Sequence, residues 1–378
     1  MPAVQRVLVV GAGVAGTAAA IFLAERGVDV DLIDAKGEVT ATGSGITLQG
    51  NALRVLHDLG VGEDVQRHGF AFTTLGLRAP DPAGTLLVEM PDARTGGPDL
   101  PATVGIPRPE LARILIERAA SAGAHVRMGT ELTGLRQDDD GVDVDLADGT
   151  TERYDLVVGA DGLHSRVREI IGIPERPAGT GMAIWRVFTP RPASVARTDL
   201  YYGGPCYIAG YCPAGEDSLY AYLVEDADVA NFQLTAAERV ARMRQLSEAY
   251  HGPWDDIRPY ITEDRGVNYT FFETHLVEGA WNRGRVVIIG DAAHSCPPTL
   301  AQGAAQALED AAVLAELLHA VDDLSPALWE SFTARRLGRA REVVGASVQL
   351  GRWLLDHERD ADVPGLMARV NALVSVPA

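Results

Sequence analysis

The chain has 378 residues, a formal net charge of -19 at pH 7 and a pI near 4.8. This acidity argues against a nucleic acid or an anionic membrane surface as partner, because both are polyanions that would repel the protein. Three cysteines without C-x-x-C spacing, and no run near the roughly 18 apolar residues of a membrane span, lead us to expect a cytoplasmic protein that binds a small molecule.

The N-terminal stretch carries a nucleotide-binding pattern. An apolar strand is predicted over residues 6–10, then a turn and helix up to residue 27, and a second strand that ends at Asp34. Gly11 permits a tight turn, Gly13 lets the backbone approach a pyrophosphate, and Gly16 lets helix and strand pack closely. The N–H groups at the helix start face the pyrophosphate, and Asp34 can bind ribose hydroxyls. The predicted contacts, for which FAD and NAD are both open, are Gly11, Gly13, Val14, Ala15, Gly16, Asp34 and Ala35.

A second motif follows in the middle of the chain. Before it we expect a helix over residues 49–59, short strands over 70–100, a helix over 109–122 and a β-meander up to residue 159. A strand then runs from Asp155 to Asp161 and leads through Gly162 and Ser165 into a helix. Carboxylates at the carboxyl edge of a sheet are typical of ligand sites in open α/β folds. The alternative is structural, a strand followed by a helix that Ser165 caps.

The second half of the chain changes from sheet to helix. Residues 180–269 are expected to form an antiparallel sheet with a helical stretch over 235–249. Tyr220 and Tyr222 share one strand face there, and such aromatic residues fit either core packing or a substrate pocket. A strand buried on both faces then ends at Gly290 and Asp291, and from Gly303 onward the pattern is mostly helical.

Three stretches together make a specific resemblance. They are Gly11–Gly16, Asp155–Arg168, and the run from Gly290-Asp291 through His294, Pro298, Gln302-Gly303 and Glu309-Asp310. In this order and spacing they resemble the three fingerprints of single-component FAD-dependent aromatic hydroxylases, the family typified by para-hydroxybenzoate hydroxylase. The chain departs from the family at Asp34-Ala35, where Glu-Arg is frequent, and near Leu300 and Ala305, where glycine and asparagine are common.

The resemblance implies roles for several residues. Asp291 binds the ribityl chain of FAD, Arg108 in an R-x-x-L pattern contacts FAD, and Asp161 belongs to the cofactor site. The helix that Gly303 and Ala304 open points its positive end at the flavin pyrimidine. The carbonyl of Pro298 lies beside the reacting edge of the flavin. The alternatives are a capping role for Asp291 and a surface position for Arg108.

The activity that the resemblance implies is a monooxygenase reaction. Electrons come from NADH or NADPH, and a flavin C4a-hydroperoxide formed with O2 passes one oxygen atom to a small electron-rich aromatic substrate of the phenol or hydroxypyridine type. Candidate catalytic residues are Pro298, His275, Tyr220 and Tyr222, and no metal site is predicted. An FAD-dependent reductase or dehydrogenase is the alternative, and a non-catalytic flavin-binding regulatory protein is a second one.

We therefore expect an α/β fold with an α+β substrate part. A Rossmann-like FAD-binding domain is interrupted by an antiparallel-sheet substrate domain and followed by a helical C-terminus. The predicted ranges are 1–70, 101–174 and 270–325 for the FAD-binding domain, 71–100 and 175–269 for the substrate domain, and 326–378 for the C-terminal helical segment.

Overall fold

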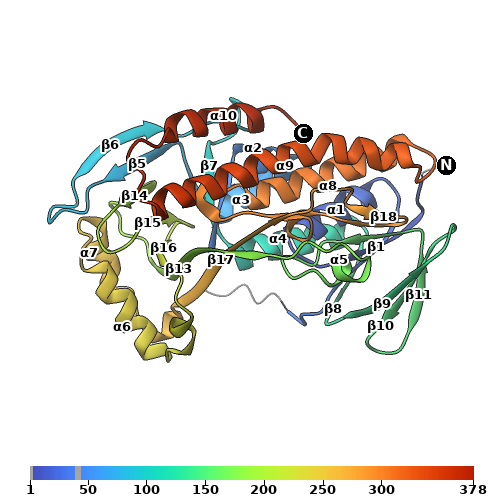
Figure 1. Ribbon diagram of the computed structural model, residues 1–378, viewed down its shortest axis with the longest axis horizontal. Coiled ribbons are helices and arrows are strands. Elements are labelled where there is room, and N and C mark those ends of the chain that lie inside the picture. Colours follow the sequence, from blue (N-terminus) through green and yellow to red (C-terminus); the bar gives the residue numbers. More distant parts are fainter. Residues whose placement is uncertain (1–2, 39–43) are drawn as a thin grey trace.

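A computed structural model describes residues 3–38 and 44–378. A six-stranded sheet of order β18-β19-β12-β1-β2-β8 forms one end of the elongated molecule (Figure 1). Its strands are β1 (Arg6–Val10), β2 (Asp29–Asp34), β8 (His125–Met128), β12 (Leu156–Gly159), β18 (Asn282–Arg283) and β19 (Val286–Ile288). All its pairs are parallel except β18 with β19. Because both faces are covered, β1, β12 and β19 are apolar runs rather than alternating ones.

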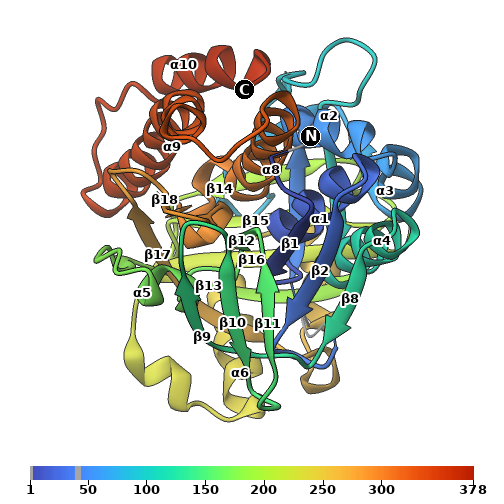
Figure 2. The same ribbon diagram turned by 90° about the vertical axis from the view of Figure 1, so that its right-hand side faces the viewer.

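Helices and a small meander pack around this sheet, as the end view in Figure 2 shows. The helices are α1 (Val14–Glu25), α4 (Arg108–Ser121), α5 (Arg166–Ile170) and α8 (Gly303–Ala320). The meander consists of β9 (Leu132–Gln137), β10 (Val142–Leu146) and β11 (Thr151–Tyr154). Tyr154 fixes it to the main sheet, since its hydroxyl donates a hydrogen bond to Asp31 at 2.7 Å.

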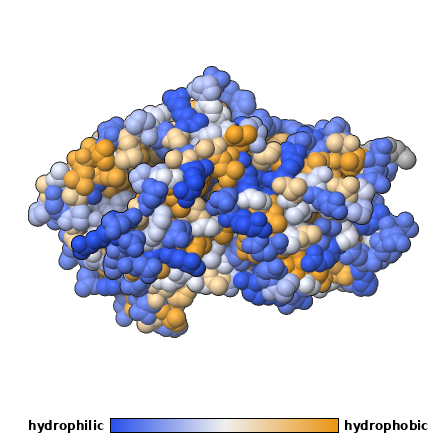
Figure 3. Space-filling view, turned by 45° about the horizontal axis from the view of Figure 1, so that its top comes forward, coloured by the Kyte–Doolittle hydropathy of each residue, from blue (hydrophilic) through white to orange (hydrophobic). Residues whose placement is uncertain are grey.

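An eight-stranded sheet of order β20-β17-β13-β16-β15-β14-β5-β6 forms the other end. Its strands are β5 (Thr74–Arg78), β6 (Leu86–Pro91), β13 (Ala178–Pro190), β14 (Thr198–Tyr202), β15 (Ile208–Pro213), β16 (Ser218–Asp226), β17 (Asn268–Leu276) and β20 (His294–Ser295). Helices α6 (Ala236–Ser247) and α7 (Pro253–Ile257) cover its outer face, where Trp185 and Trp254 are fully buried. Figure 3 shows hydrophobic side chains gathered near the β5–β6 end, where Leu87 is 66% exposed.

The inner face of the eight-stranded sheet looks toward the rest of the chain. A three-stranded sheet of β3 (Gly45–Gln49), β7 (Thr103–Pro107) and β4 (Phe70–Phe72) lies against it, and α2 (Gly50–Asp58) and α3 (Gly62–His68) pack on this small sheet. A Cβ atom on Gly45 would lie 2.8 Å from the Tyr220 ring, so β3 passes directly over this face. The long helix α9 (Pro326–Leu355) runs along both ends of the molecule and is followed by α10 (Val363–Ser375) (Figure 1).

The expected α/β fold with an antiparallel second part and a helical C-terminus is confirmed. One feature of the predicted division differs: β17 and β20 fall largely within residues 270–325, which we assigned to the FAD-binding part, but both strands pair into the eight-stranded sheet. Within residues 270–325 the chain contributes strands to both sheets. A domain boundary drawn by residue number therefore does not separate the two sheets. Among the described helices, we find none with the length and apolar character to cross a membrane.

Candidate active site

The glycine loop leaves the start of α1 open to a ligand. Gly13 is the N-cap residue, and no side chain caps the helix. A Cβ atom on Gly13 would meet nothing within 4 Å, whereas one on Gly11 would collide with the backbone of Ala160. Within the described chain, no acceptor takes the N–H groups of Val14, Ala15 or Gly16. These donors lie at the positive end of the helix dipole and can bind a phosphate group.

The start of α8 is open in the same way. Gln302 occupies the N-cap position, but its side chain binds Asn51 and Gln49 instead of the helix N–H groups. A Cβ atom on Gly303 would meet nothing within 4 Å, and the following Ala304 is half-buried. The N-terminus of α8 therefore presents a second set of free donors, where electron-rich atoms of a ligand are stabilised.

The loop before α8 carries Pro298 at the surface. Pro298 begins a short 3-10 turn, Pro298–Leu300, and its carbonyl accepts a hydrogen bond from the Ala301 N–H group at 3.1 Å. Ala301 has a φ of 52°, a left-handed conformation that favours glycine. The hydroxyl of Thr299 donates to the Ser347 carbonyl of α9 at 2.8 Å, so the C-terminal helix holds this loop in place.

A turn after β19 joins the two helix starts. Gly290 has a φ of 59°, and a Cβ atom there would lie 2.8 Å from the Cβ atom of Ala15 in α1 and 3.3 Å from that of Ala307 in α8. Only glycine fits between the two helices in this conformation. The Gly290 N–H group donates to Asp310 at 2.8 Å, which fixes the turn. The buried strand therefore ends by placing Asp291 beside the open ends of α1 and α8.

Asp291 and Arg108 face the same space. The side chain of Asp291 is accessible, and no described residue forms a hydrogen bond or ion pair with it. The surrounding protein nevertheless raises the pKa of this carboxyl by desolvation, and interactions with His294 and Arg108 oppose the rise. Arg108 is exposed at the start of α4, where its Nε reaches the Gly45 carbonyl at 3.4 Å. A ligand between them would find both a carboxylate and a guanidinium.

Asp34 fixes the glycine loop from the end of β2. Its carboxylate accepts hydrogen bonds from the N–H groups of Ala12 at 2.9 Å and Lys36 at 2.8 Å. Each oxygen keeps a lone pair for a further donor such as a ribose hydroxyl. Ala35, next to it, is exposed.

The set of donors and acceptors fits FAD. Two uncapped helix starts suit a pyrophosphate and an electron-rich ring edge, and carboxylates at strand ends suit the hydroxyl groups of a ribose and a ribityl chain. The residues that could hold FAD are those predicted above around α1 and α8, together with Asp34, Arg108 and Asp291. Their individual contacts with the cofactor remain predictions.

Asp161 has a structural role that the sequence only partly indicated. Its carboxylate accepts hydrogen bonds from the Ser165 hydroxyl at 2.5 Å and from the N–H groups of Arg166 at 2.7 Å and Val167 at 3.0 Å. Ser165 in turn accepts from the Arg168 N–H group as N-cap of α5. The structural alternative for the second motif is therefore present, and a cofactor contact by Asp161 remains a prediction.

Sequence reasoning missed a buried ionic network that supports the site. Arg336 of α9 donates to Asp310 at 2.6 Å and to Glu309 at 3.1 Å, and all three side chains are almost fully buried. Arg339 also binds Glu309, at 2.7 Å, and His294 contacts Asp310 at 2.7 Å. The arginines lower the cost of burying the two carboxylates. A helical repeat of arginine at positions 336 and 339, opposite the acidic pair 309–310, was the available signal.

One face of the substrate-end sheet is unusual because its side chains are only half-buried although other elements cover it. We call Arg186, Phe188, Tyr220, Tyr222 and Thr270 the inner-face cluster. Ring centroids of neighbouring aromatic residues lie 5.8 Å apart for Phe188–Tyr220 and 5.5 Å apart for Tyr220–Tyr222. On the opposite face the alternating residues, such as Trp185 and Tyr269, are fully packed. The inner-face cluster therefore leaves room that core packing would have filled.

The two tyrosines of the cluster hold their protons. Burial raises the pKa of Tyr220, although Arg186 and Arg108 oppose the rise, and burial raises the pKa of Tyr222 well above its ordinary value. Both phenols are therefore hydrogen-bond donors near neutral pH rather than bases. Gly45 lies against the Tyr220 ring and its carbonyl accepts a hydrogen bond from Arg108, so the inner-face cluster and the cofactor residues adjoin.

His275, a catalytic candidate from the sequence, is enclosed by other groups of the protein. Its ring lies 3.0 Å from Arg168 on one side and 3.0 Å from the Ser295 hydroxyl on the other, and it is buried. Desolvation and the charge of Arg168 lower its pKa to about 4. Because side chains alternate along β17, His275 also points away from the face that carries Thr270. The structure does not bring His275 together with Tyr220 and Tyr222.

Comparisons with known proteins extend this picture. The sequence model of a family described as FAD binding domain matches residues 5–347. The putative FAD-dependent monooxygenase YetM of Bacillus subtilis is 32% identical over 361 residues, which cover 95% of this chain and 96% of that protein. The 3-amino-4-hydroxybenzoate 2-monooxygenase PtnB3 of Streptomyces platensis is 32% identical, over 92% of this chain and 87% of its own length. The crystal structure of Klebsiella pneumoniae HpxO complexed with FAD and uric acid shares the fold, with a TM-score of 0.81 at 22% identity over 98% of this chain and 92% of that one.

Proposed function

From the premise that this chain belongs to the FAD-dependent monooxygenases of the aromatic hydroxylase family, we propose that it hydroxylates a small electron-rich aromatic compound of the phenol or hydroxypyridine type. NADH or NADPH supplies two electrons, one atom of O2 enters the ring as a hydroxyl group, and the other leaves as water. When bound, FAD supplies the electron transfer and the activation of oxygen. The cytoplasmic location expected from the sequence is kept as part of this proposal.

The half-buried inner-face cluster is the observation that carries the proposal. Half-buried aromatic side chains next to Arg108 suit the binding of a flat aromatic ring. The curated relative PtnB3 is named for a substrate of this kind, a hydroxylated benzoate. A ring held by the inner-face cluster would lie next to Arg108, because Gly45 lies against the Tyr220 ring and its carbonyl accepts a hydrogen bond from Arg108.

The chain itself then has three tasks. The covering elements β3 and α9 keep water from the ring, since an exposed site would waste reducing equivalents as peroxide. The tyrosines, which keep their protons, donate hydrogen bonds that orient polar substituents of the ring. The network around Asp310 holds the Gly290 turn, which keeps the N-termini of α1 and α8 in their relative positions.

The test is oxidation of NADH and NADPH by the purified, FAD-loaded protein in air and under nitrogen, with and without a panel of phenols and hydroxypyridines. We expect one ring class to stimulate oxidation and to yield a hydroxylated product only in air. Equal product formation under nitrogen would contradict the proposal and favour a reductase or dehydrogenase. No stimulation by any ring would contradict the proposed substrate class.

A further inference from the structure

We propose that Arg186 binds an anionic oxygen of the aromatic substrate, either a ring carboxylate or an ionised ring hydroxyl. This inference rests on the proposed function, because it names the chemical class that the same site accepts. It adds a residue that the sequence motifs do not contain, since Arg186 lies on β13, outside all three fingerprints.

The charge of Arg186 is not matched by the protein. Its Nη2 atom donates to the Thr270 hydroxyl at 2.6 Å, but its Nε atom is buried and has no partner. No ion pair joins Arg186 to a carboxylate anywhere in the part of the chain that the structure describes. In a chain with 52 acidic and 33 basic residues, carboxylates are the abundant partner, so an interior guanidinium without one is conspicuous.

The neighbours of Arg186 are uncharged groups that can surround a ring. Arg186 lies opposite Tyr222 on one adjacent strand and opposite Asn268 on the other. The phenol of Tyr220 is close enough for the guanidinium to influence its ionisation, and the Phe188 ring packs at a tilt against the Tyr220 ring on the same face. A guanidinium presents several N–H donors in a fixed plane, which match the paired oxygens of a carboxylate or a single oxyanion. The inner-face cluster therefore combines aromatic side chains with one cation at their side.

No described group of the inner-face cluster can act as a base toward a ring hydroxyl. Tyr220 and Tyr222 keep their protons, and His275 points to the other face of β17. An ionised ring oxygen would thus be stabilised by the positive charges of Arg186 and Arg108 rather than formed by a neighbouring side chain. Positive charge next to a bound phenol lowers the pKa of that phenol, because it favours the charged form.

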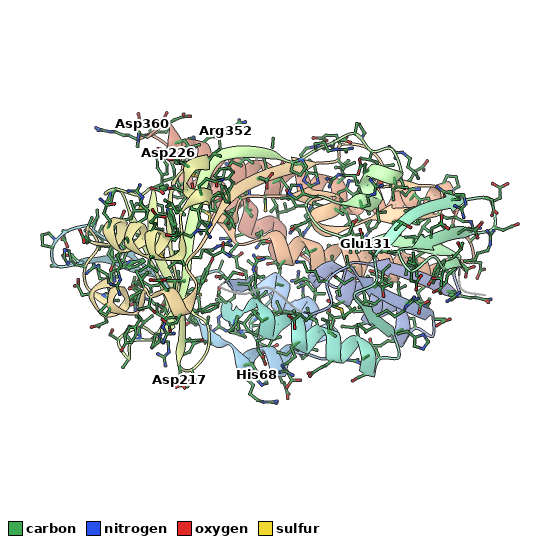
Figure 4. The ribbon with its side chains drawn as sticks, turned by 90° about the horizontal axis from the view of Figure 1, so that it is seen from below. His68, Glu131, Asp217, Asp226, Arg352 and Asp360 are labelled. Carbon is green, nitrogen blue, oxygen red and sulfur yellow. The ribbon has the colours of Figure 1, made fainter. Side chains whose placement is uncertain are left out.

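The experiment measures ligand binding to the FAD-loaded, oxidised protein without turnover. The probes are two isosteric pairs, benzoate with benzamide and 4-nitrophenol with 4-nitroaniline. Binding is followed by the change in flavin absorbance, and ionisation of bound 4-nitrophenol by the visible band of its anion. The variants are R186Q and R186K, with R352Q as a control that removes one arginine from the exposed surface of α9 (Figure 4).

For the unmodified protein we expect at least one anionic probe to bind about tenfold or more tightly than its neutral isostere. R186Q should remove this preference, R186K should keep part of it, and R352Q should leave it unchanged. Preference for benzoate identifies a carboxylate as the bound group, and increased ionisation of bound 4-nitrophenol identifies a ring oxyanion. Retained FAD content and an unchanged circular dichroism spectrum show that R186Q is folded. If R186Q does not fold, the anion preference of R186K is compared with that of the unmodified protein.

Three results would overturn the inference. Equal binding of charged and neutral isosteres, or no binding of either pair, means that the site does not select an anion. An unchanged preference in R186Q, with a shifted flavin reduction potential, means that Arg186 serves the flavin instead. Failure of the proposed function is seen separately, as absence of oxygen-dependent product, because anion binding is measured without NAD(P)H or turnover.

Discussion

Two interior arginines, Arg336 and Arg186, show opposite treatments of a positive charge. Arg336, between α8 and α9, is fully buried and binds Asp310, Glu309 and Gln306. Arg186, on the inner face of the eight-stranded sheet, is half-buried, and it donates to the Thr270 hydroxyl but binds no carboxylate among the described residues. An arginine that is paired with carboxylates holds the fold together, whereas an arginine without a carboxylate can still bind an anionic ligand. The comparison separates residues that support the site from residues that meet the ligand.

The largest effect should come from removing the matched arginine. R336M leaves Asp310 and part of Glu309 buried without their principal cation, so we expect a loss of about 3–5 kcal/mol in the free energy of unfolding. R186M strands no carboxylate, and its loss should stay within about 1 kcal/mol. Urea unfolding of both FAD-loaded variants checks this contrast. Equal destabilisation would mean that Arg186 also has a structural partner.

His275, beside the matched region, should give the protein a characteristic pH dependence. Its pKa is about 4 in the folded protein and 6.5 ordinarily. Below pH 6.5 the unfolded chain takes up a proton that the folded chain refuses, so stability is full above that pH and falls as the pH drops toward 4. The loss approaches about 3 kcal/mol.

The measurement for His275 is urea unfolding of the wild type and of H275Q between pH 7 and pH 4.5. Glutamine does not titrate, so the free energy of unfolding should fall less steeply with decreasing pH in H275Q. The difference in slope corresponds to at most one proton bound on unfolding. If the two stability curves run parallel, burial does not suppress the protonation of His275. The interpretation of His275 as a neutral, structural residue would then be wrong.

Arg108 should behave as a ligand-facing cation on the cofactor side. It is exposed and has only a long contact with the Gly45 carbonyl, so R108Q should leave stability unchanged while weakening FAD binding about tenfold. R113Q is a matched control on the same helix, since Arg113 pairs with Glu110 and Glu117 at the surface. Flavin fluorescence titration of the apoprotein distinguishes the two. An unchanged dissociation constant in R108Q would place Arg108 among the surface arginines.

The smallest effect should come from Thr270, whose hydroxyl accepts a hydrogen bond from Arg186. T270V removes the hydroxyl that orients the guanidinium, and we expect about a threefold weaker affinity for the preferred anionic probe. T189V is the control, because the Thr189 hydroxyl on β13 is buried without a partner and its loss breaks no hydrogen bond. Stronger binding in T270V would show that Thr270 competes with the ligand for the guanidinium.

Parts of the site followed from local sequence, and parts did not. Gly11 and Gly13 were readable because each carries a backbone requirement that a short pattern expresses, whereas the requirement at Gly290 became visible only between α1 and α8. The role of Asp161 was half readable, since a capping aspartate and a cofactor aspartate look alike in sequence. The environment of His275 was not readable, because it comes from Arg168 and Ser295, which lie 107 and 20 residues away.

The sequence by itself determined the family, the FAD-dependent monooxygenase chemistry and the order of strands and helices around the glycine loops. These features depend on local periodicity and on glycines that only certain turns require. Only the tertiary structure decided which charges are matched. Asp310 and Arg336 meet across two helices, while Arg186 meets no carboxylate among the described residues. Charge pairing depends on contacts between distant segments, and therefore on packing that no local pattern encodes.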